Sequence, residues 1–155
     1  MMASKIRKAE IRPQSRDWRL DLLREKAWLD GCWVDADEGR RIQVTDPADG
    51  RLIGSVPDMG ARETLRAITA AEAAWPAWRK LLPQERARIL RHWADLMIQN
   101  REELALLMTL EQGKPLAEAR GEIDYAASFL EWFGEEAKRM YGEIIPSHLP
   151  DSKLI

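Results

Sequence analysis

The segment TLEQGKPLAEARGE, residues 109–122, decides how the second half of this chain folds. Its Gly113-Lys114 pair is also the ending of a phosphate-binding loop. That loop needs a glycine five residues earlier and a Ser or Thr after the lysine. Met108 and Pro115 occupy those two positions, so the segment is not a nucleotide-binding loop. Because glycine ends helices and proline begins them, the pattern predicts one helix that stops at Gly113 and another that starts at Pro115.

The helix after this corner is apolar over more than half of its circumference. We expect it to run from Pro115 to about Tyr141, with Gly142 as its stop signal. One side carries Leu116, Ala119, Ile123, Ala126, Ala127, Leu130, Phe133, Gly134 and Ala137, and a neighbouring side carries Gly121, Tyr125, Phe129 and Trp132. A helix of this kind is normally buried on two sides. The second side is therefore either plain core or the wall of a pocket.

Three further helices are expected before this corner. Residues 61–75 are alanine-rich with helical spacing, and Pro76 should end or kink that helix. Pro83 suits the first turn of the next helix. Asn100 followed by Glu103 resembles a capping box that opens a third helix.

The first sixty residues predict short antiparallel strands. Asp30-Gly31 lies between apolar runs in WLDGCWV, residues 28–34, which is a hairpin signal. Alternating residues around 42–44 and 52–56 predict two more strands, joined by the turn sequence DPADG at 46–50. Ser15 can cap a short helix over residues 16–26. The expected fold class is α+β, with short N-terminal antiparallel strands followed by four helices.

Composition excludes several classes of function. The chain has 155 residues, 45% of them apolar and 32% charged, with a net charge of −2, which fits one soluble domain and gives no bulk basic character for nucleic acid. No apolar run approaches the ~20 residues that span a membrane. Residues 1–15 are basic and favour a disordered tail. A single cysteine permits no internal disulfide, which fits the cytoplasm.

That cysteine, Cys32, could be a nucleophile. No histidine is near it in the sequence, where the two histidines are His92 and His148. We interpret Cys32 as a small, half-buried residue at the start of a strand.

Several stretches, taken together, resemble a known family. They are AWLDGCWVDAD at 27–37, VTDPADGRLIGSVPDMG at 44–60, WPAWRKL at 75–81 and MTLEQGKPLAEARGEIDYAASFLEWFGEEAKRMYGEIIP at 108–146. In this order they resemble the N-terminal part of NAD(P)-dependent aldehyde dehydrogenases, and within that superfamily the succinate-semialdehyde dehydrogenases. The resemblance runs from Arg16 to Ile155.

The resemblance implies an oxidoreductase that uses NADP or NAD on a small semialdehyde and assembles as a homo-oligomer. In that family a cysteine thiolate attacks the aldehyde, hydride passes to the nicotinamide, and a glutamate activates water. The matching motifs lie beyond Ile155, and Cys32 does not match the nucleophile. We therefore expect no catalytic or cofactor-binding residue here, no cofactor bound by this chain alone, and no activity alone.

Weaker correspondences give candidate sites. Gly121, Tyr125 and Phe129 match positions that resemble the family's substrate-entry tunnel, with core packing as the equal alternative. Glu111, with a backbone carbonyl near Thr45, matches a monovalent-cation site of some relatives, although an exposed Glu111 without that role is the more ordinary interpretation. Residues 16–146 then belong to the cofactor-binding domain, and 147–155 begin the oligomerisation strands.

Two hypotheses follow. The chain is an N-terminal fragment of such a dehydrogenase, or it is a stand-alone helical interaction module that docks onto a full-length relative. A module adapted to live alone should carry polar residues where the family buries its helices. The retained Tyr125, Phe129 and Trp132 favour the fragment, which should then expose apolar surface and be marginally stable. The choices between NAD and NADP, and between succinate and glutarate semialdehyde, stay open.

Overall fold

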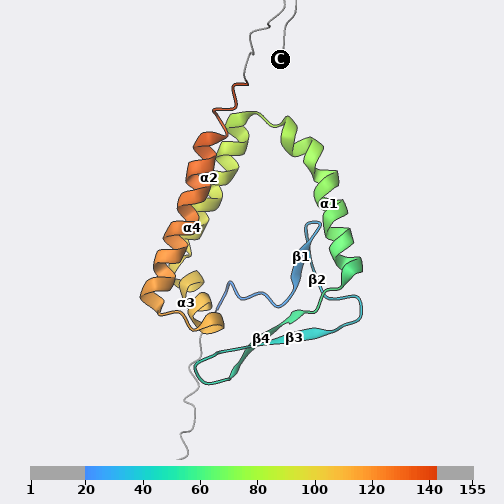
Figure 1. Ribbon diagram of the computed structural model, residues 1–155, viewed down its shortest axis with the longest axis vertical. Helices are drawn as coiled ribbons and strands as arrows, with labels where there is room; N and C mark the ends of the chain where they lie inside the picture. Colours follow the sequence, from blue (N-terminus) through green and yellow to red (C-terminus); the bar gives the residue numbers. More distant parts are fainter. Residues whose placement is uncertain (1–19, 143–155) are drawn as a thin grey trace, which may run out of the picture.

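The computed structural model describes residues 20–142, which form two β-hairpins followed by four helices (Figure 1). In chain order the elements are β1 Ala27–Leu29, β2 Cys32–Val34, β3 Arg41–Thr45, β4 Leu52–Pro57, α1 Ala61–Lys80, α2 Pro83–Gln99, α3 Arg101–Gln112 and α4 Leu116–Glu136. Each hairpin is its own two-stranded antiparallel sheet. The predicted α+β class, with antiparallel strands and then four helices, is confirmed.

Figure 1 shows an open frame rather than a closed layer structure. Helices α2 and α4 lie side by side and form one limb, with α3 at their foot. Helix α1 forms the other limb. The β3–β4 hairpin lies along the base, and β1–β2 lies near the foot of α1.

The first hairpin turns where the sequence predicts. Asp30 and Gly31 both have positive φ angles, 49° and 78°, as a two-residue type I′ turn requires. This register places Trp28 opposite Trp33. Their rings meet edge to face with centroids 5.1 Å apart.

The second hairpin is closed by an acidic turn. Asp46 is only 6% exposed. Its carboxylate accepts hydrogen bonds from the backbone N–H of Ala48 at 2.9 Å and from the Arg51 guanidinium at 3.1 Å. These bonds satisfy a carboxylate that burial would otherwise destabilise. The predicted turn at 46–50 is confirmed.

Small residues set the packing of the helical limb. Ala87 and Ala94 are the buried residues of α2, and a Cβ atom added at Gly134 of α4 would lie 3.5 Å from the Ala87 carbonyl oxygen. Between α3 and α4, the buried cluster is Ala105, Ala119 and Ile123. Met97, Leu104, Met108 and Leu116 surround that cluster. The helices therefore approach closely across alanine and glycine.

The predicted corner between α3 and α4 is confirmed. Gly113 ends α3 with a φ of 75°, in the left-handed region, and its N–H donates to the Thr109 carbonyl at 2.9 Å. Pro115 is the N-cap of α4. A Cβ atom at Gly113 would lie 3.0 Å from the Pro47 ring, so the corner also sits against the β3–β4 turn.

Two helix boundaries differ from the prediction. Of the two outcomes expected at Pro76, an end or a kink, the end does not occur, because helix α1 continues through Pro76 to Lys80. Helix α4 stops at Glu136 rather than at Tyr141. Beyond Gly134, the last residue buried in the limb, the backbone forms tighter turns, with the N–H of Lys138 bonded to the Glu135 carbonyl.

Residues 20–26 are not helical either, and residues 16–19 of the predicted helix lie outside the described part of the chain. Tertiary contacts compete with local helix formation here. The N–H of Leu22 donates to the Glu103 carboxylate on α3. That bond also removes Glu103 from the predicted capping box, and the Asn100 side chain bonds to the Leu96 carbonyl instead.

Candidate functional site

The candidate site is the outward face of α4, the side turned away from α2 and α3. Ala119, Ile123, Ala127 and Gly134 are the buried residues of this helix. At 100° per residue, Tyr125, Phe129 and Trp132 fall on the opposite side. These three side chains are 62%, 46% and 65% exposed. Among residues 20–142, helix α4 therefore has one apolar side that packs against other helices and one that remains exposed.

The predicted tunnel residues Gly121, Tyr125 and Phe129 form one continuous row on that outward face. The rings of Tyr125 and Phe129 meet edge to face with centroids 4.8 Å apart and planes at 72°. No atom lies within 4 Å of the place where Gly121 would carry a Cβ atom. The row thus offers an aromatic surface beside an open backbone, which suits contact with a short methylene chain.

Phe133 is an exception to the predicted grouping. The sequence analysis places it with the packed residues of α4, but it is 56% exposed. Its neighbour Gly134 takes the close approach to α2 in its place. Phe133 therefore extends the apolar surface beyond the row that we expected.

Glu111 and Thr45, the candidate cation ligands, lie on neighbouring elements. Glu111 is in the last turn of α3, Thr45 ends β3, and both are exposed. A small cavity between α3 and β4 is lined by Glu111, Glu25 and Val44, among others. Within residues 20–142, no three His, Cys, Asp or Glu side chains are grouped to hold a metal ion. The cation site stays a prediction that would depend mainly on backbone carbonyls.

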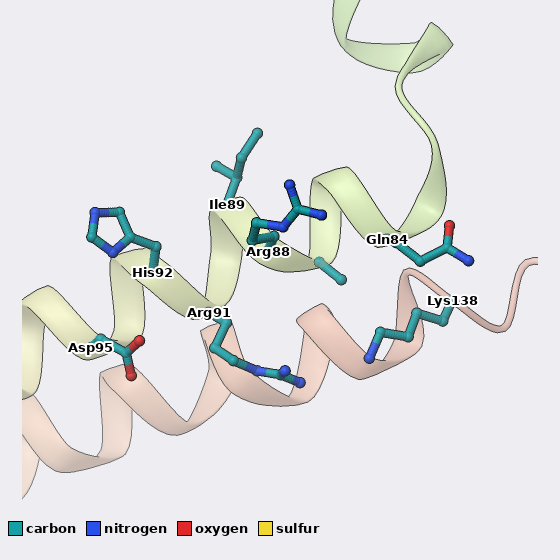
Figure 2. Close-up of a pocket in the computed structure, with 8 residues that line it drawn as sticks. Gln84, Arg88, Ile89, Arg91, His92, Asp95 and Lys138 are labelled. Carbon is teal, nitrogen blue, oxygen red and sulfur yellow. The ribbon is translucent and has the colours of Figure 1, made fainter.

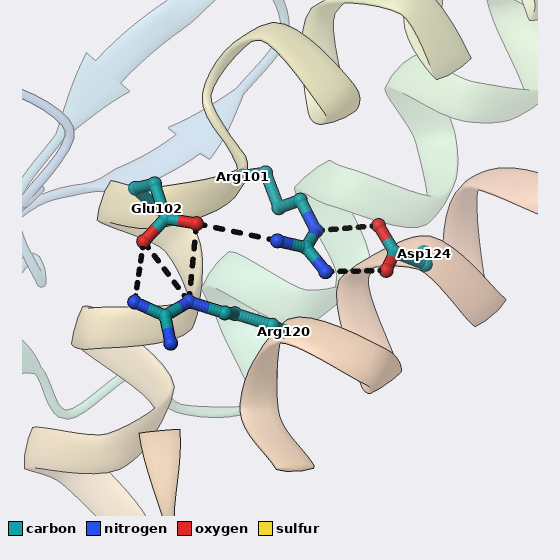
Figure 3. Close-up of polar contacts among 4 residues, drawn as sticks. All are labelled: Arg101, Glu102, Arg120 and Asp124. Carbon is teal, nitrogen blue, oxygen red and sulfur yellow. Dashed lines mark hydrogen bonds and ion pairs between the residues drawn. The ribbon is translucent and has the colours of Figure 1, made fainter. Parts of the chain in front are cut away.

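A polar network fastens α4 to α3 beside the candidate site (Figure 3). The Arg101 guanidinium binds both oxygens of Asp124, each at 2.6 Å, and Arg120 binds Glu102 at 2.7 Å. Arg101 lowers the pKa of Asp124, and Arg120 lowers that of Glu102. The sequence alone does not reveal this network, because its partners come from different helices. The pairs fix the rotation of α4, and so the direction of its aromatic row.

A second polar cluster holds the start of α1. The Asp37 carboxylate binds Arg62 at 2.7 Å, and Arg66 at 2.7 and 2.8 Å. Arg66 first, and then Arg62, hold the pKa of Asp37 far below its usual range. The buried Glu63 accepts from the backbone N–H of Asp37 at 3.0 Å and from that of Gly60 at 3.1 Å. The loop before β3 is thereby tied to the first turn of α1.

A shallow recess lies along α2 (Figure 2). It is lined by seven residues of α2 and by Lys138, which lies just beyond the end of α4; the seven are Gln84, Ala87, Arg88, Ile89, Arg91, His92 and Asp95. Glu135 pairs with Arg91, and also with Lys138 at 3.4 Å. Two carboxylates, Asp95 in the lining and Glu135 beside it, offset most of the charge of Arg88, Arg91 and Lys138, so the recess is not a strongly charged site.

Cys32 stands apart from these features. It lies at the start of β2, as predicted, but it is exposed rather than half-buried. No described part of the chain covers this position of the two-stranded sheet, so the thiol is open to solvent.

Comparison with known proteins decides the family. The model of the aldehyde dehydrogenase family matches residues 33–155. The chain belongs to the aldehyde dehydrogenase family.

The chain is strongly similar to enzymes that are named for semialdehyde substrates. The chain is 66% identical over 134 residues to a glutarate-semialdehyde dehydrogenase of Pseudomonas aeruginosa, covering 86% of this chain and 28% of that protein. It is 59% identical over 135 residues to the NADP-dependent succinate-semialdehyde dehydrogenase of Escherichia coli, covering 87% of this chain and 28% of that enzyme.

Solved structures give the same answer for the fold. A crystal structure of an NADP-dependent enzyme of Escherichia coli superposes with a TM-score of 0.82 at 59% identity, over 84% of this chain and 27% of that one. The succinate-semialdehyde dehydrogenase of Burkholderia pseudomallei gives 0.79 at 56% identity, over 81% of this chain and 26% of that one.

The chain thus spans little more than a quarter of the length of these dehydrogenases. The matched portion is their N-terminal part. In the part of this chain that the structure describes, no helix is long and apolar enough to cross a bilayer. These relatives have further polypeptide beyond the part that matches this chain.

Proposed function

We propose that this chain supplies the N-terminal portion of a dehydrogenase that oxidises succinate or glutarate semialdehyde to the acid with NADP or NAD. Relatives at 66% and 59% identity carry those two substrate names, and one of them carries NADP. Identity at this level, over a segment that makes up 28% of each relative, supports a common reaction. A cytoplasmic location and homo-oligomeric assembly belong to the same proposal.

The observation that carries the proposal is the outward face of α4. Tyr125, Phe129 and Trp132 remain large and apolar although 46–65% of each is exposed. An independent helical module would gain solubility from polar residues at these positions. Their retention indicates a helix shaped to contact further dehydrogenase polypeptide or its substrate. It also makes the stand-alone interaction module the weaker candidate.

Within the complete enzyme, the row Gly121, Tyr125 and Phe129 forms one wall of the substrate passage. Aromatic rings bind methylene groups and exclude water, while Gly121 leaves room beside them. Glu111 and the Thr45 carbonyl supply oxygen ligands for a monovalent cation. Residues 16–146 belong to the cofactor-binding domain. The chain contributes packing and passage walls, and the nucleophile and the base come from the remaining polypeptide.

The test is a chimaera in which residues 1–155 replace the matching N-terminal part of the Pseudomonas aeruginosa enzyme. We expect the chimaera to reduce NADP or NAD with glutarate or succinate semialdehyde, and the 155-residue chain alone to be inactive. Phe129→Ala should lower kcat/KM by about tenfold or more, in line with one lost aromatic contact. His92→Ala, in the α2 recess, is the matched control and should leave kcat/KM unchanged.

A folded, oligomeric chimaera without activity toward either semialdehyde would overturn the proposed reaction. Equal effects of Phe129→Ala and His92→Ala would remove the passage role and leave the family assignment intact.

A further inference from the structure

The chain contains two Asp-Gly pairs, and the structure holds them in different ways. Asp30-Gly31 forms the tip of the β1–β2 hairpin, and Asp49-Gly50 lies in the turn between β3 and β4. All four residues are exposed. In such a pair the glycine nitrogen can attack the aspartate Cγ, because glycine has no Cβ atom to hinder the approach. Since exposure is alike, any difference in reactivity depends on the hydrogen bonds of each pair.

Hydrogen bonds engage both reacting groups in the second hairpin. The Gly50 N–H donates to the Asp46 carbonyl at 2.7 Å, and a carboxylate oxygen of Asp49 accepts from the Arg51 N–H at 3.1 Å. The same oxygen lies 3.8 Å from the Arg51 guanidinium. Attack by the Gly50 nitrogen would therefore have to break the first bond and turn the carboxylate out of the second.

The pair at the tip of the first hairpin has neither constraint. Among residues 20–142, no hydrogen bond reaches the Gly31 N–H or the Asp30 carboxylate. No atom lies within 4 Å of the place where Gly31 would carry a Cβ atom. Asp30 is also the one non-glycine residue of the described part with a positive φ, 49°, a conformation that costs an L-residue energy.

The turn type itself leaves these groups free. A type I′ turn needs a positive φ at both central residues, which favours Asp or Asn followed by Gly. Its own hydrogen bond joins the residues on either side, here Leu29 and Cys32, which pair across the strands. The residues that make the turn possible are therefore those that are able to react.

We propose that Asp30 is a site of spontaneous isoaspartate formation, and that Asp49 is protected from the same reaction by its hydrogen bonds. The Gly31 nitrogen bonds to the Asp30 Cγ and gives up its proton, the bond from Cγ to one carboxyl oxygen breaks, and one water molecule leaves. The product is a cyclic succinimide. Water then opens the ring at the side-chain carbonyl, which restores aspartate, or at the main-chain carbonyl, which routes the backbone through the Asp30 Cβ. The reaction consumes no oxidant, and it is independent of the dehydrogenase activity.

The modification would open the first hairpin. An isoaspartyl link adds an atom to the backbone of a turn whose length sets the strand register. That register holds Trp28 opposite Trp33, with ring centroids 5.1 Å apart. We expect this ring contact to be lost, and near-ultraviolet circular dichroism detects the loss.

Ageing of the full chain in neutral buffer tests the proposal. Peptide mass spectrometry measures the succinimide, which is lighter by one water molecule. A protease that cleaves before aspartate but not before isoaspartate measures the final product. We expect at least about fivefold more modification at Asp30 than at Asp49, the factor for one hydrogen bond that must first break. In concentrated guanidinium chloride the hydrogen bonds are absent, so the two amounts should become equal.

Matched variants connect the modification with the hairpin. Asp30→Gly removes the reacting carboxyl and keeps a sequence that suits a type I′ turn, so its near-ultraviolet signal should survive ageing. Asp49→Ser removes the other carboxyl and should lose that signal as the unaltered chain does.

Absence of modification at Asp30, or equal modification of the two pairs in the folded chain, would overturn the proposal. An excess at Asp30 that guanidinium chloride does not reduce would overturn the role of the hydrogen bonds. Loss of the near-ultraviolet signal in aged Asp30→Gly would overturn the link between the modification and the opening of the hairpin.

Discussion

Helix α1 and the limb formed by α2, α3 and α4 are built on opposite principles. The limb is held by alanine, glycine and isoleucine that are almost completely buried, such as Ala105 and Ala119 at 0% exposure. Along the twenty residues of α1, the one buried residue is Glu63, an acid. Its apolar residues Leu65 and Ile68 are 64% and 58% exposed.

The difference shows which contacts this chain makes with itself and which it leaves to other polypeptide. Most helical stability in proteins comes from the packing of an apolar face, which α1 lacks here, so α1 depends on its charged anchor to the loop before β3. The limb has its own apolar core and depends less on its ion pairs. A region can therefore be helical for two different reasons, and the two should respond differently to substitution and to acid.

The largest expected effect is in the limb. Ile123→Ala removes three carbon atoms from the buried cluster between α3 and α4, where Ile123 is 6% exposed. We expect a loss of about 3 kcal/mol in the free energy of unfolding, enough to unfold much of a small chain. Urea denaturation followed by circular dichroism measures this loss.

Tyr125→Ala on the outward face of α4 is the paired control. It should change the free energy of unfolding by less than about 0.5 kcal/mol, because exposed side chains contribute little. Equal losses for the two variants would mean that α4 is packed on both sides in solution, and the contrast between its faces would disappear.

A smaller effect is expected at the anchor of α1. Asp37→Asn removes the charge that binds Arg62 and Arg66. Amide exchange in the first turns of α1 should accelerate by about tenfold, as when a local opening becomes easier, while amides of α4 keep their rates. Residue-resolved hydrogen exchange measures both helices in one sample. Equal acceleration in α4 would show that the two regions unfold as one unit.

The sequence predicts local features of this chain well and its long-range contacts poorly. The turn at Asp30-Gly31 and the corner at Gly113 and Pro115 depend on backbone chemistry that single residues carry. The non-helical conformation of residues 20–26 does not, because Leu22 and Glu25 find their partners on α3 and β4, 81 and 30 residues away. A local helix signal could not anticipate that competition.

The same limit applies to the candidate site. The aromatic row of α4 follows from helical spacing, and its residues could be named in advance. The ion pairs that orient α4 could not, because Arg101 and Asp124 lie 23 residues apart on different helices. Phe133 was misplaced because a helical wheel does not show that Gly134 would take the contact with α2.

Low pH should also distinguish α1 from the limb, because the two should lose amide protection at different pH values. Arg66 and Arg62 lower the pKa of Asp37, and the Asp37 N–H lowers that of Glu63. Carboxylates with a lowered pKa stabilise the fold fully above the unfolded value of about 4, and that contribution is lost as the pH falls from this value through the lower folded-state pKa. As the pH is lowered below about 4, amides of α1 should therefore lose protection before those of α4. Simultaneous loss would contradict the distinction.

The smallest effect should come from the ion pairs on the limb. Asp124 also has a lowered pKa, because Arg101 binds it. However, its side chain is 47% exposed, so solvent screens the pair. Asp124→Asn should change the equilibrium constant for unfolding by less than about fivefold. In the chimaeric dehydrogenase the same substitution should act on KM more than on stability, because it loosens the rotation of α4 that directs Tyr125 and Phe129. A stability loss comparable to that of Ile123→Ala would instead mean that charge, and not the apolar cluster, holds α3 to α4. The limb and α1 would then be built on the same principle.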